Sequence, residues 1–224
     1  MDLEQMKRKY AYTLARVGLN VQKGQTVLVE AAIEGWQFTS IFAEECYKLG
    51  AGNVVVSYLD QANLKVAAQY RPDEAVRRVE EWESSMYQKY LDEGACYVRL
   101  EGVNPKLMEG VSEKQSNAIF AHVDGVRNIM RRASREKHCQ WLIAMDKKGE
   151  EALTELWDIL LKLCYIDETN DVVETWERLR EQKASRGKAV DALGLKKLHY
   201  TASNGTDLTV ELTPWAWGAK GSTV

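Results

Sequence analysis

A histidine and a carboxylate stand two positions apart in His122-Val123-Asp124, the pairing that comes nearest to a divalent metal site in this 224-residue chain. One imidazole and one carboxylate can share such an ion. The pair falls inside a segment with helical periodicity, however, and residues two apart on a helix point about 200° away from each other. We therefore interpret His122 and Asp124 as separate surface residues.

The other two histidines also lack a chemical partner close in sequence. His138 adjoins Cys139 at a predicted junction between a helix and a strand, and His199 lies in an alternating strand. Both patterns favour packed or hydrogen-bonded side chains. The chain has no GxSxG nucleophile elbow and no HExxH zinc motif. The sequence thus predicts no catalytic, no cofactor-binding and no metal-ligating residue.

The turn after the first predicted strand does not have the form of a phosphate-binding loop. It reads Ala31-Ala32-Ile33-Glu34-Gly35-Trp36, with neither GxGxxG nor GxxxxGK[ST]. In a phosphate-binding loop, glycines let the backbone approach the pyrophosphate closely. The side chains of Ile33 and Glu34 would prevent that approach here. This argues against a nucleotide-binding function.

A run of basic residues allows two interpretations. It comprises Arg127, Arg131, Arg132, Arg135 and Lys137, several of them spaced four apart on one helical face. The favoured interpretation is a solvated face near a helix C-terminus, where cations suit the helix dipole. The alternative is contact with an anion or a carboxylate, which the planar guanidinium fork suits.

Composition excludes several classes of protein. With 45% hydrophobic and 28% charged residues, the chain is expected to fold, and its net charge of −3 gives no case for binding nucleic acid or a membrane surface. The first residues lack the basic and apolar regions of a secretory signal, so we expect a cytoplasmic location. Four scattered cysteines without a CxxC pair, expected to be buried thiols, are Cys46, Cys96, Cys139 and Cys164.

Strand and helix patterns alternate along most of the chain. Short apolar, largely β-branched runs predict strands over residues 26–31, 53–58, 94–100 and 139–145. Helical periodicity is found over residues 2–18, 36–49, 72–91, 105–108, 112–137, 150–163 and 172–193. We expect the first two strands to be buried on both faces. The alternation predicts an α/β fold, a mainly parallel sheet flanked by helices in a Rossmann-like layered domain.

The C-terminal region has a different pattern. Two extended runs flank Ser203-Asn204-Gly205 and predict a β-hairpin over residues 198–212. A hairpin needs a further layer to pack against, and few residues follow it. We therefore expect an α/β N-terminal domain over residues 1–193 and the incomplete beginning of a second domain over 194–224. Trp215 and Trp217, in this last segment, are expected to be exposed.

An ordered set of short stretches resembles the M29 family of metallo-aminopeptidases, of the aminopeptidase T and aminopeptidase S type. The matching stretches are residues 10–25, 43–51, 156–159 and 176–177, then Leu198-His199-Tyr200-Thr201 and Gly205-Thr206-Asp207-Leu208-Thr209-Val210. The set covers nearly the whole chain, and the last stretch is its most specific part. Members of the family are longer than this chain.

The resemblance implies an enzyme that releases N-terminal amino acids from peptides with two divalent metal ions of zinc or cobalt type. It further implies a homodimer when complete. In the family the metal ligands are glutamates, histidines and an aspartate of the second half, so none is carried onto this sequence. His122-Val123-Asp124 shares only letters with a late family motif.

Two hypotheses for function follow. The first is the N-terminal part of an M29-like aminopeptidase, without the family's metal ligands and inactive alone. The alternative is a stand-alone, non-catalytic binding or scaffold α/β module.

Overall fold

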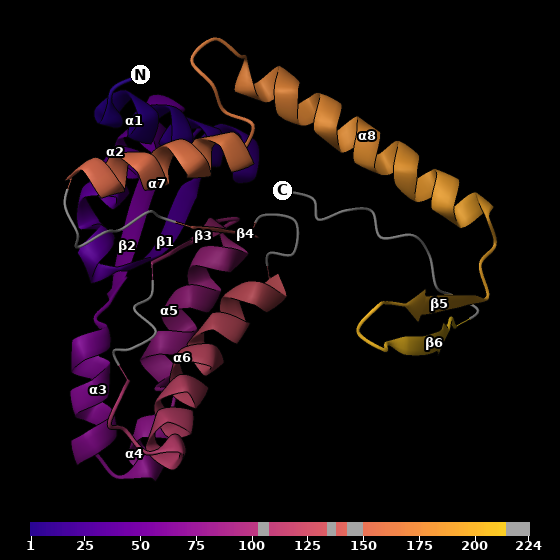
Figure 1. Ribbon diagram of the computed structural model, residues 1–224. Helices are drawn as coiled ribbons and strands as arrows, with labels where there is room; N and C mark the ends of the chain where they lie inside the picture. Colours follow the sequence, from indigo (N-terminus) through magenta and orange to yellow (C-terminus); the bar gives the residue numbers. More distant parts are fainter. Residues whose placement is uncertain (103–107, 134–137, 143–149, 214–224) are drawn as a thin grey trace. The chain divides into compact units, whose positions relative to one another are not determined.

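The computed structural model describes residues 1–102, 108–133, 138–142 and 150–213 (Figure 1). The chain divides into two compact units, Met1–Asn170 and Asp171–Val224. The first unit holds the sheet and most of the helices, and the second holds one long helix and the hairpin. The predicted domain boundary after residue 193 stays a prediction.

A four-stranded parallel sheet forms the centre of the first unit. Its strands are β1 (Thr26–Ala32), β2 (Asn53–Leu59), β3 (Cys96–Glu101) and β4 (His138–Leu142), in the order β2-β1-β3-β4. Val29 of β1 lies in register with Val56 of β2 and Val98 of β3. The expected α/β fold with a parallel sheet is confirmed. Residues 143–145, predicted to extend the fourth strand, lie outside the described residues.

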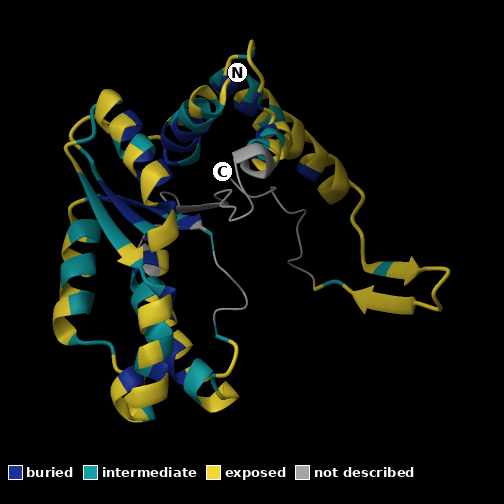
Figure 2. Ribbon diagram, turned by 60° about the vertical axis from the view of Figure 1, so that its left-hand side comes forward, coloured by how far each residue is buried: buried dark blue, intermediate teal, exposed yellow. Residues whose placement is uncertain are grey.

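The position of each strand in the sheet decides how deeply it is buried. Val27, Leu28 and Val29 are at most 2% exposed, so β1 is buried on both faces as expected. The same expectation for β2 is wrong. Its residues are half-buried or exposed, because β2 is an edge strand of the described sheet and pairs there with β1 alone (Figure 2).

Successive strand residues point to opposite faces of the sheet, and each face receives its own helices. Cys96 faces Cys46 of α2 (Trp36–Lys48), whereas Tyr97 packs in one cluster with Met130 of α6 (Glu113–Ala133). Three aromatic rings join α1 (Leu3–Thr13), α2 and α7 (Glu150–Leu163) on the first face. They are Tyr10, Phe38 and Trp157, with centroids 5.2–5.7 Å apart. The second face is covered by α5 (Glu81–Asp92) and α6.

A small helical cluster lies beyond the sheet and includes a helix that the periodicity did not predict. This helix, α3 (Gln61–Tyr70), begins at Asp60, whose Oδ1 accepts a hydrogen bond from Asn63 N. Ala68 of α3 and Val76 of α4 (Asp73–Arg77) pack on the first turns of α6.

The single helix predicted over residues 72–91 is in fact two helices. Arg78 has an extended backbone, and Glu80 then starts α5 with a capping box. In that box Glu80 N donates to Glu83 Oε2 at 2.8 Å. In α5, Trp82 is 66% exposed, whereas Tyr87, Tyr90 and Leu91 pack toward the sheet.

The remaining helices follow the predictions closely. The N-terminal helix continues as one π-helical segment, Leu14–Gly18, and the helix predicted over 150–163 has the same bounds as α7. Residues 105–107 and 134–137, predicted to be helical, lie outside the described residues. Along the described parts of the chain, no helix is long and apolar enough to cross a membrane.

The second unit begins with α8 (Val172–Ala192), capped by Asp171, whose Oδ1 accepts from Val173 N and Glu174 N. The predicted hairpin is confirmed as β5 (Lys197–Thr201) paired antiparallel with β6 (Asp207–Glu211). Leu198 pairs with Val210 and Tyr200 with Leu208, so these four apolar side chains share one face. Trp215 and Trp217 lie outside the described residues.

Candidate functional site

A row of polar residues crosses the sheet at one level. Glu30 of β1 lies in register with Ser57 of β2 and with Arg99 of β3. The row lies on the face covered by α5 and α6. A carboxylate in a central strand is costly unless it is paired and hydrogen-bonded. The surroundings of Glu30 are therefore the first place to look for a functional site among the described residues.

Arg127 of α6 supplies the charge that Glu30 requires. Its Nε and Nη2 donate to Glu30 Oε1 at 2.9 and 2.5 Å, and the two side chains are 14% and 13% exposed. The prediction of a solvated arginine face is thus wrong for Arg127, and the alternative, contact with a carboxylate, holds. Arg131 is exposed and lies 3.5 Å from Asn128 Oδ1. The side chains of Arg132, Arg135 and Lys137 lie outside the described residues.

Two tyrosines and a serine complete the polar cluster. Tyr97 donates its hydroxyl to Glu30 Oε2 at 3.2 Å, and Ser57 Oγ lies 3.1 Å from the hydroxyl of Tyr87 of α5. Burial, and after it the negative charge of Glu30, raises the pKa of the Tyr97 phenol far above its usual value. Burial also raises the pKa of Tyr87. Both phenols consequently keep their protons and remain hydrogen-bond donors.

The space inside this cluster is too small for a substrate. A cavity of about 10 Å³ is lined by Leu28, Val29, Glu30, Val55, Ser57, Tyr87, Tyr97 and Met130. A peptide or an amino acid cannot enter a space of this size. The cluster thus joins the sheet to its helices and is not a catalytic centre.

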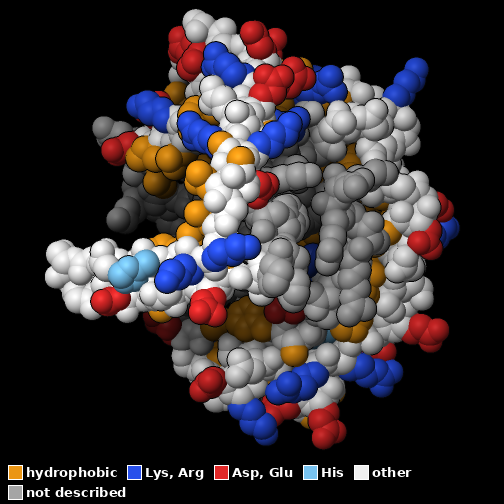
Figure 3. Space-filling model, turned by 90° about the vertical axis from the view of Figure 1, so that its right-hand side faces the viewer, with side chains coloured by type: hydrophobic (Ala, Val, Ile, Leu, Met, Phe, Trp, Pro, Cys, Tyr) orange, Lys and Arg blue, Asp and Glu red, His pale blue; other side chains and the backbone are white. Residues whose placement is uncertain are grey.

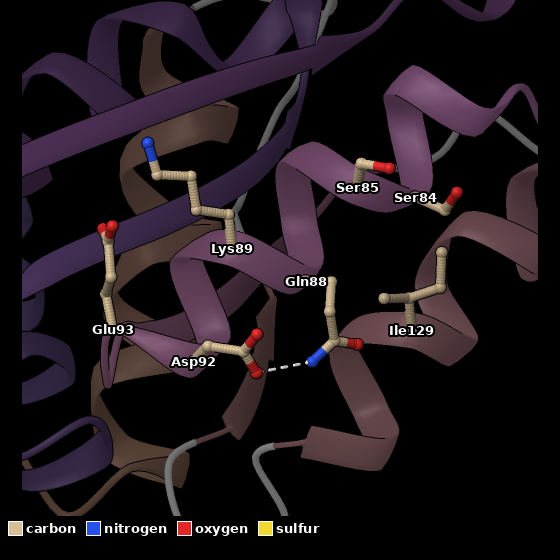
Figure 4. A pocket seen from close by; sticks show the side chains of 7 residues that line it. All are labelled: Ser84, Ser85, Gln88, Lys89, Asp92, Glu93 and Ile129. Carbon is tan, nitrogen blue, oxygen red and sulfur yellow. Dashed lines mark hydrogen bonds between the residues drawn. The ribbon is translucent and has the colours of Figure 1, made fainter.

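A larger, open hollow lies on the outer side of α5 (Figure 4). It measures about 640 Å³ and is lined by Ser84, Ser85, Gln88, Lys89, Asp92, Glu93 and Ile129. Figure 4 shows these side chains spread along the helix, with Lys89 and Glu93 directed away from Ser84 and Ile129. Gln88 Nε2 donates to Asp92 Oδ1 at 2.8 Å, and no base faces either serine among the residues drawn. The hollow offers no convergent catalytic groups.

His122 and Asp124 do not converge, as predicted. His122 Nδ1 lies 2.7 Å from the carbonyl oxygen of Arg78, so this nitrogen carries a proton, and Nε2 lies 3.4 Å from Glu83 Oε1. Asp124 is exposed and lies 3.8 Å from Arg127 Nη1. His122 is 25% exposed and lies at the surface beside Arg78 and Glu83.

His199 has the hydrogen-bonded role that was expected. Its Nε2 lies 2.8 Å from Asp207 Oδ1 across the hairpin, and both side chains are exposed. The side chains of His138 and Cys139 lie outside the described residues. His199 and Asp207 thus link the two strands of the hairpin. Together they could provide at most two ligands to a metal ion.

The described residues do not fit a two-metal site. Nowhere in the described ranges do three or more His, Cys, Asp or Glu side chains gather closely enough to hold an ion. The described cysteines offer no ligand set either. Cys46 is buried and Cys164 is half-buried, so the expectation of a buried thiol is wrong for Cys164, and desolvation raises the pKa of both thiols, that of Cys46 strongly. Cys96 is buried too. Acidic and basic side chains are interspersed on the face that Figure 3 presents.

These features define a Rossmann-like α/β layered protein whose described polar clusters hold its elements together. Comparison with known families gives the next step. The model of the family described as Thermophilic metalloprotease (M29) matches residues 3–223. The chain belongs to the M29 family of metalloproteases, and the resemblance found in the sequence is confirmed.

Individual relatives carry aminopeptidase names. Aminopeptidase AmpS of Bacillus subtilis is 27% identical, over 99% of this chain and 57% of the relative. Aminopeptidase T of Thermus thermophilus is 28% identical, over 94% of this chain and 55% of the relative. The chain thus spans about half the length of the curated relatives that it matches.

A solved structure shows the same fold. Wild-type AmpT from Thermus thermophilus superimposes with a TM-score of 0.81 at 24% identity, over 93% of this chain and 54% of that structure. The match covers almost all of this chain, so both units take part in it. It establishes the fold and leaves the chemistry to be argued from residues.

Proposed function

We propose that this chain is the N-terminal, α/β part of a metal-dependent aminopeptidase that releases N-terminal amino acids from peptides. Membership of the M29 family and relatives named as aminopeptidases support the activity. The observation that carries the proposal is length, because the chain spans 57% of AmpS and 55% of aminopeptidase T. The catalytic residues of the complete enzyme then belong to sequence beyond these 224 residues.

The metal ligands are part of that proposal. A two-metal hydrolase needs several carboxylates and imidazoles around a pair of ions, which activate water and polarise the scissile carbonyl. No such group occurs in the described ranges of this chain. We propose that two divalent ions of zinc or cobalt type bind in the other part of the complete enzyme, and that the enzyme is a homodimer.

The role proposed for the present residues is structural. The sheet, with the Glu30–Arg127 pair holding α6 against it, forms a firm layer that shapes access to the metal site. Nothing in this role requires the 224 residues to bind metal themselves. The isolated chain is therefore expected to be inactive.

The test is an assay of the purified 224-residue chain with aminoacyl p-nitroanilides and added Zn²⁺ or Co²⁺. We expect no turnover above the buffer rate and no tight binding of two ions by calorimetry. Full-length AmpS of Bacillus subtilis, assayed in parallel, shows that the substrates and metals are competent. Chelator-sensitive turnover by the sequence-verified chain would overturn the proposal.

The alternative, a stand-alone binding or scaffold module, is favoured by one observation. Residues Met1–Asn170 form a compact unit with their own sheet and core. A self-contained module predicts one cooperative unfolding transition and a monodisperse protein that resists protease throughout. Preferential cleavage after about Leu195, together with aggregation of the protein, supports instead the proposal that the chain is part of a longer enzyme.

A further inference from the structure

The small cavity under α5 and α6 has the composition of a water site. Its polar lining residues are Glu30, Ser57, Tyr87 and Tyr97, whose side chains are hydrogen-bonded in pairs. Its apolar lining comes from Leu28, Val29, Val55 and Met130. A buried water needs about 10–15 Å³ of accessible space and two to four polar partners. The volume of about 10 Å³ is enough for one.

Counting hydrogen-bond donors shows why a partner is needed there. Ser57 and Tyr87 each carry one hydroxyl hydrogen, and the 3.1 Å bond between them uses only one of the two. Whichever residue donates, one hydrogen has no acceptor within the described part of the chain. Both side chains are half-buried, and a donor hydrogen that points into the cavity and away from solvent needs an acceptor there.

The acceptor lies across the same cavity. Glu30 Oε2 accepts one bond, from the Tyr97 hydroxyl at 3.2 Å, and a carboxylate oxygen has two lone pairs. The other oxygen, Oε1, accepts both bonds from Arg127. A surplus donor and a surplus acceptor lining one cavity are the two partners that a bridging water connects.

We propose that this cavity binds one ordered water, which accepts the free hydroxyl hydrogen of the Ser57–Tyr87 pair and donates to Glu30 Oε2. The water completes a continuous polar chain from β2 and α5, through Ser57 and Tyr87, to β1 and α6, through Glu30 and Arg127. The Ser57–Tyr87 pair and the Glu30–Arg127 pair then act as one network.

The direct test is a crystal structure of the 224-residue chain at a resolution that shows ordered waters. We expect one density peak within hydrogen-bond distance of Glu30 Oε2 and of a hydroxyl of Ser57 or Tyr87. A dry cavity in a crystal that shows other buried waters overturns the proposal.

A double-mutant cycle tests the same proposal in solution. Tyr87→Phe is expected to raise the equilibrium constant for unfolding about tenfold, through the loss of a part-buried hydrogen bond. The matched control, Tyr90→Phe, removes the same atom from the same helix. The Tyr90 hydroxyl makes no hydrogen bond within the described ranges, so we expect a change of less than about twofold.

The variant Ser57→Ala/Tyr87→Phe separates a bridged network from an isolated pair. Removing both partners of an isolated pair is nearly neutral, so stability would return close to that of the wild type. With the water present, the double change strips the water and Glu30 of their partners. The double variant is then expected to be at least as unstable as the less stable of the two single variants. A free energy of unfolding that returns close to the wild-type value would overturn the proposal.

Discussion

Glu30 is the residue on which the sheet's second face depends. Its carboxylate lies in a central strand, accepts two hydrogen bonds from Arg127 and one from Tyr97, and is 13% exposed. Removing one member of such a pair leaves the other charge buried and uncompensated. Removing one partner is therefore expected to destabilise the fold by more than the intact pair stabilises it.

We accordingly expect Glu30→Ala to destabilise the chain by about 3–5 kcal/mol, measured by chemical denaturation. Replacing both partners together, as Glu30→Leu/Arg127→Met, is expected to recover most of that loss, because no buried charge remains. Arg8→Ala serves as the control, since Arg8 pairs with Glu44 on the surface, 2.8 Å apart. A Glu30→Ala effect no larger than that of Arg8→Ala would contradict this account.

The buried phenol of Tyr97 makes stability depend on alkaline pH. Burial raises its pKa in the folded chain, whereas an unfolded tyrosine ionises near about pH 10. Above that pH the unfolded state binds fewer protons than the folded state, so stability is full below about pH 10 and falls as the pH rises further. Each such group contributes a slope of about 1.4 kcal/mol per pH unit.

Tyr97→Phe should therefore reduce that slope by roughly one group's contribution, about 1.4 kcal/mol per pH unit. The measurement is the free energy of unfolding between pH 8 and about pH 11. Tyr70→Phe alters a tyrosine that is 82% exposed and should leave the slope as in the wild type. Equal slopes for wild type and Tyr97→Phe would show that this phenol ionises in the folded chain.

At the scale of elements, three glycines lie where the turn before β1 contacts the turn before β2. Gly24 N donates to Gly50 O at 2.8 Å, and Gly52 N donates to Gln25 O at 2.9 Å. A Cβ added at Gly52 would lie 2.5 Å from the carbonyl oxygen of Gly24, which is backbone and cannot rotate away. These hydrogen bonds join the two turns directly before the paired residues Thr26 and Asn53.

Gly52→Ala is expected to cost about 1–3 kcal/mol through this collision, measured by thermal or chemical unfolding. The comparison variant is Gly24→Ala. A Cβ there meets nothing within 4 Å, although its φ of +78° still strains an alanine by about 1–2 kcal/mol. Combining both changes tests whether the turns are coupled, and a neutral Gly52→Ala would rule out the close approach.

Most elements could be predicted from periodicity, and the exceptions have physical reasons. The helix α3 was missed because its residues have no clear apolar stripe, and Val66 and Tyr70 are exposed. The break between α4 and α5 depends on the extended Arg78 and the cap at Glu80, which are local conformations within a continuous helical pattern.

The polar cluster was harder to predict, because its residues are far apart in sequence. Glu30 interrupts an apolar strand, which is a visible signal. Its partner Arg127 belongs to a run of basic residues, and the sequence pattern does not distinguish the one that faces the sheet from the others. Only the strand order, which places β1 between β2 and β3 beneath α6, brings the partners together.

At the scale of the whole molecule, the two units differ in how well their backbone is protected. The strand β1 is buried on both faces, whereas every described residue of β6 and all but Leu198 of β5 are exposed. A two-stranded hairpin is marginally stable in water without a further layer. We expect amide hydrogens of β1 to exchange at the slow, global-unfolding limit and those of β5 and β6 to exchange far faster.

Hydrogen–deuterium exchange read by mass spectrometry checks this expectation in the 224-residue chain. The sheet peptides containing Val27–Val29 provide the internal reference for slow exchange. Protection of the hairpin equal to that of β1 would mean that a partner layer covers it in solution.

The strand order has a consequence for synthesis on the ribosome. The strand β1 can pair with β2 after one helical crossover, but its other edge waits for β3, which follows α3, α4 and α5 in the chain. Until β3 has left the ribosome, β1, which is buried on both faces in the folded chain, presents an open edge to other chains. Such edges promote aggregation, and contacts between distant segments also form slowly. The nascent chain is therefore most vulnerable during translation of the residues between β2 and β3.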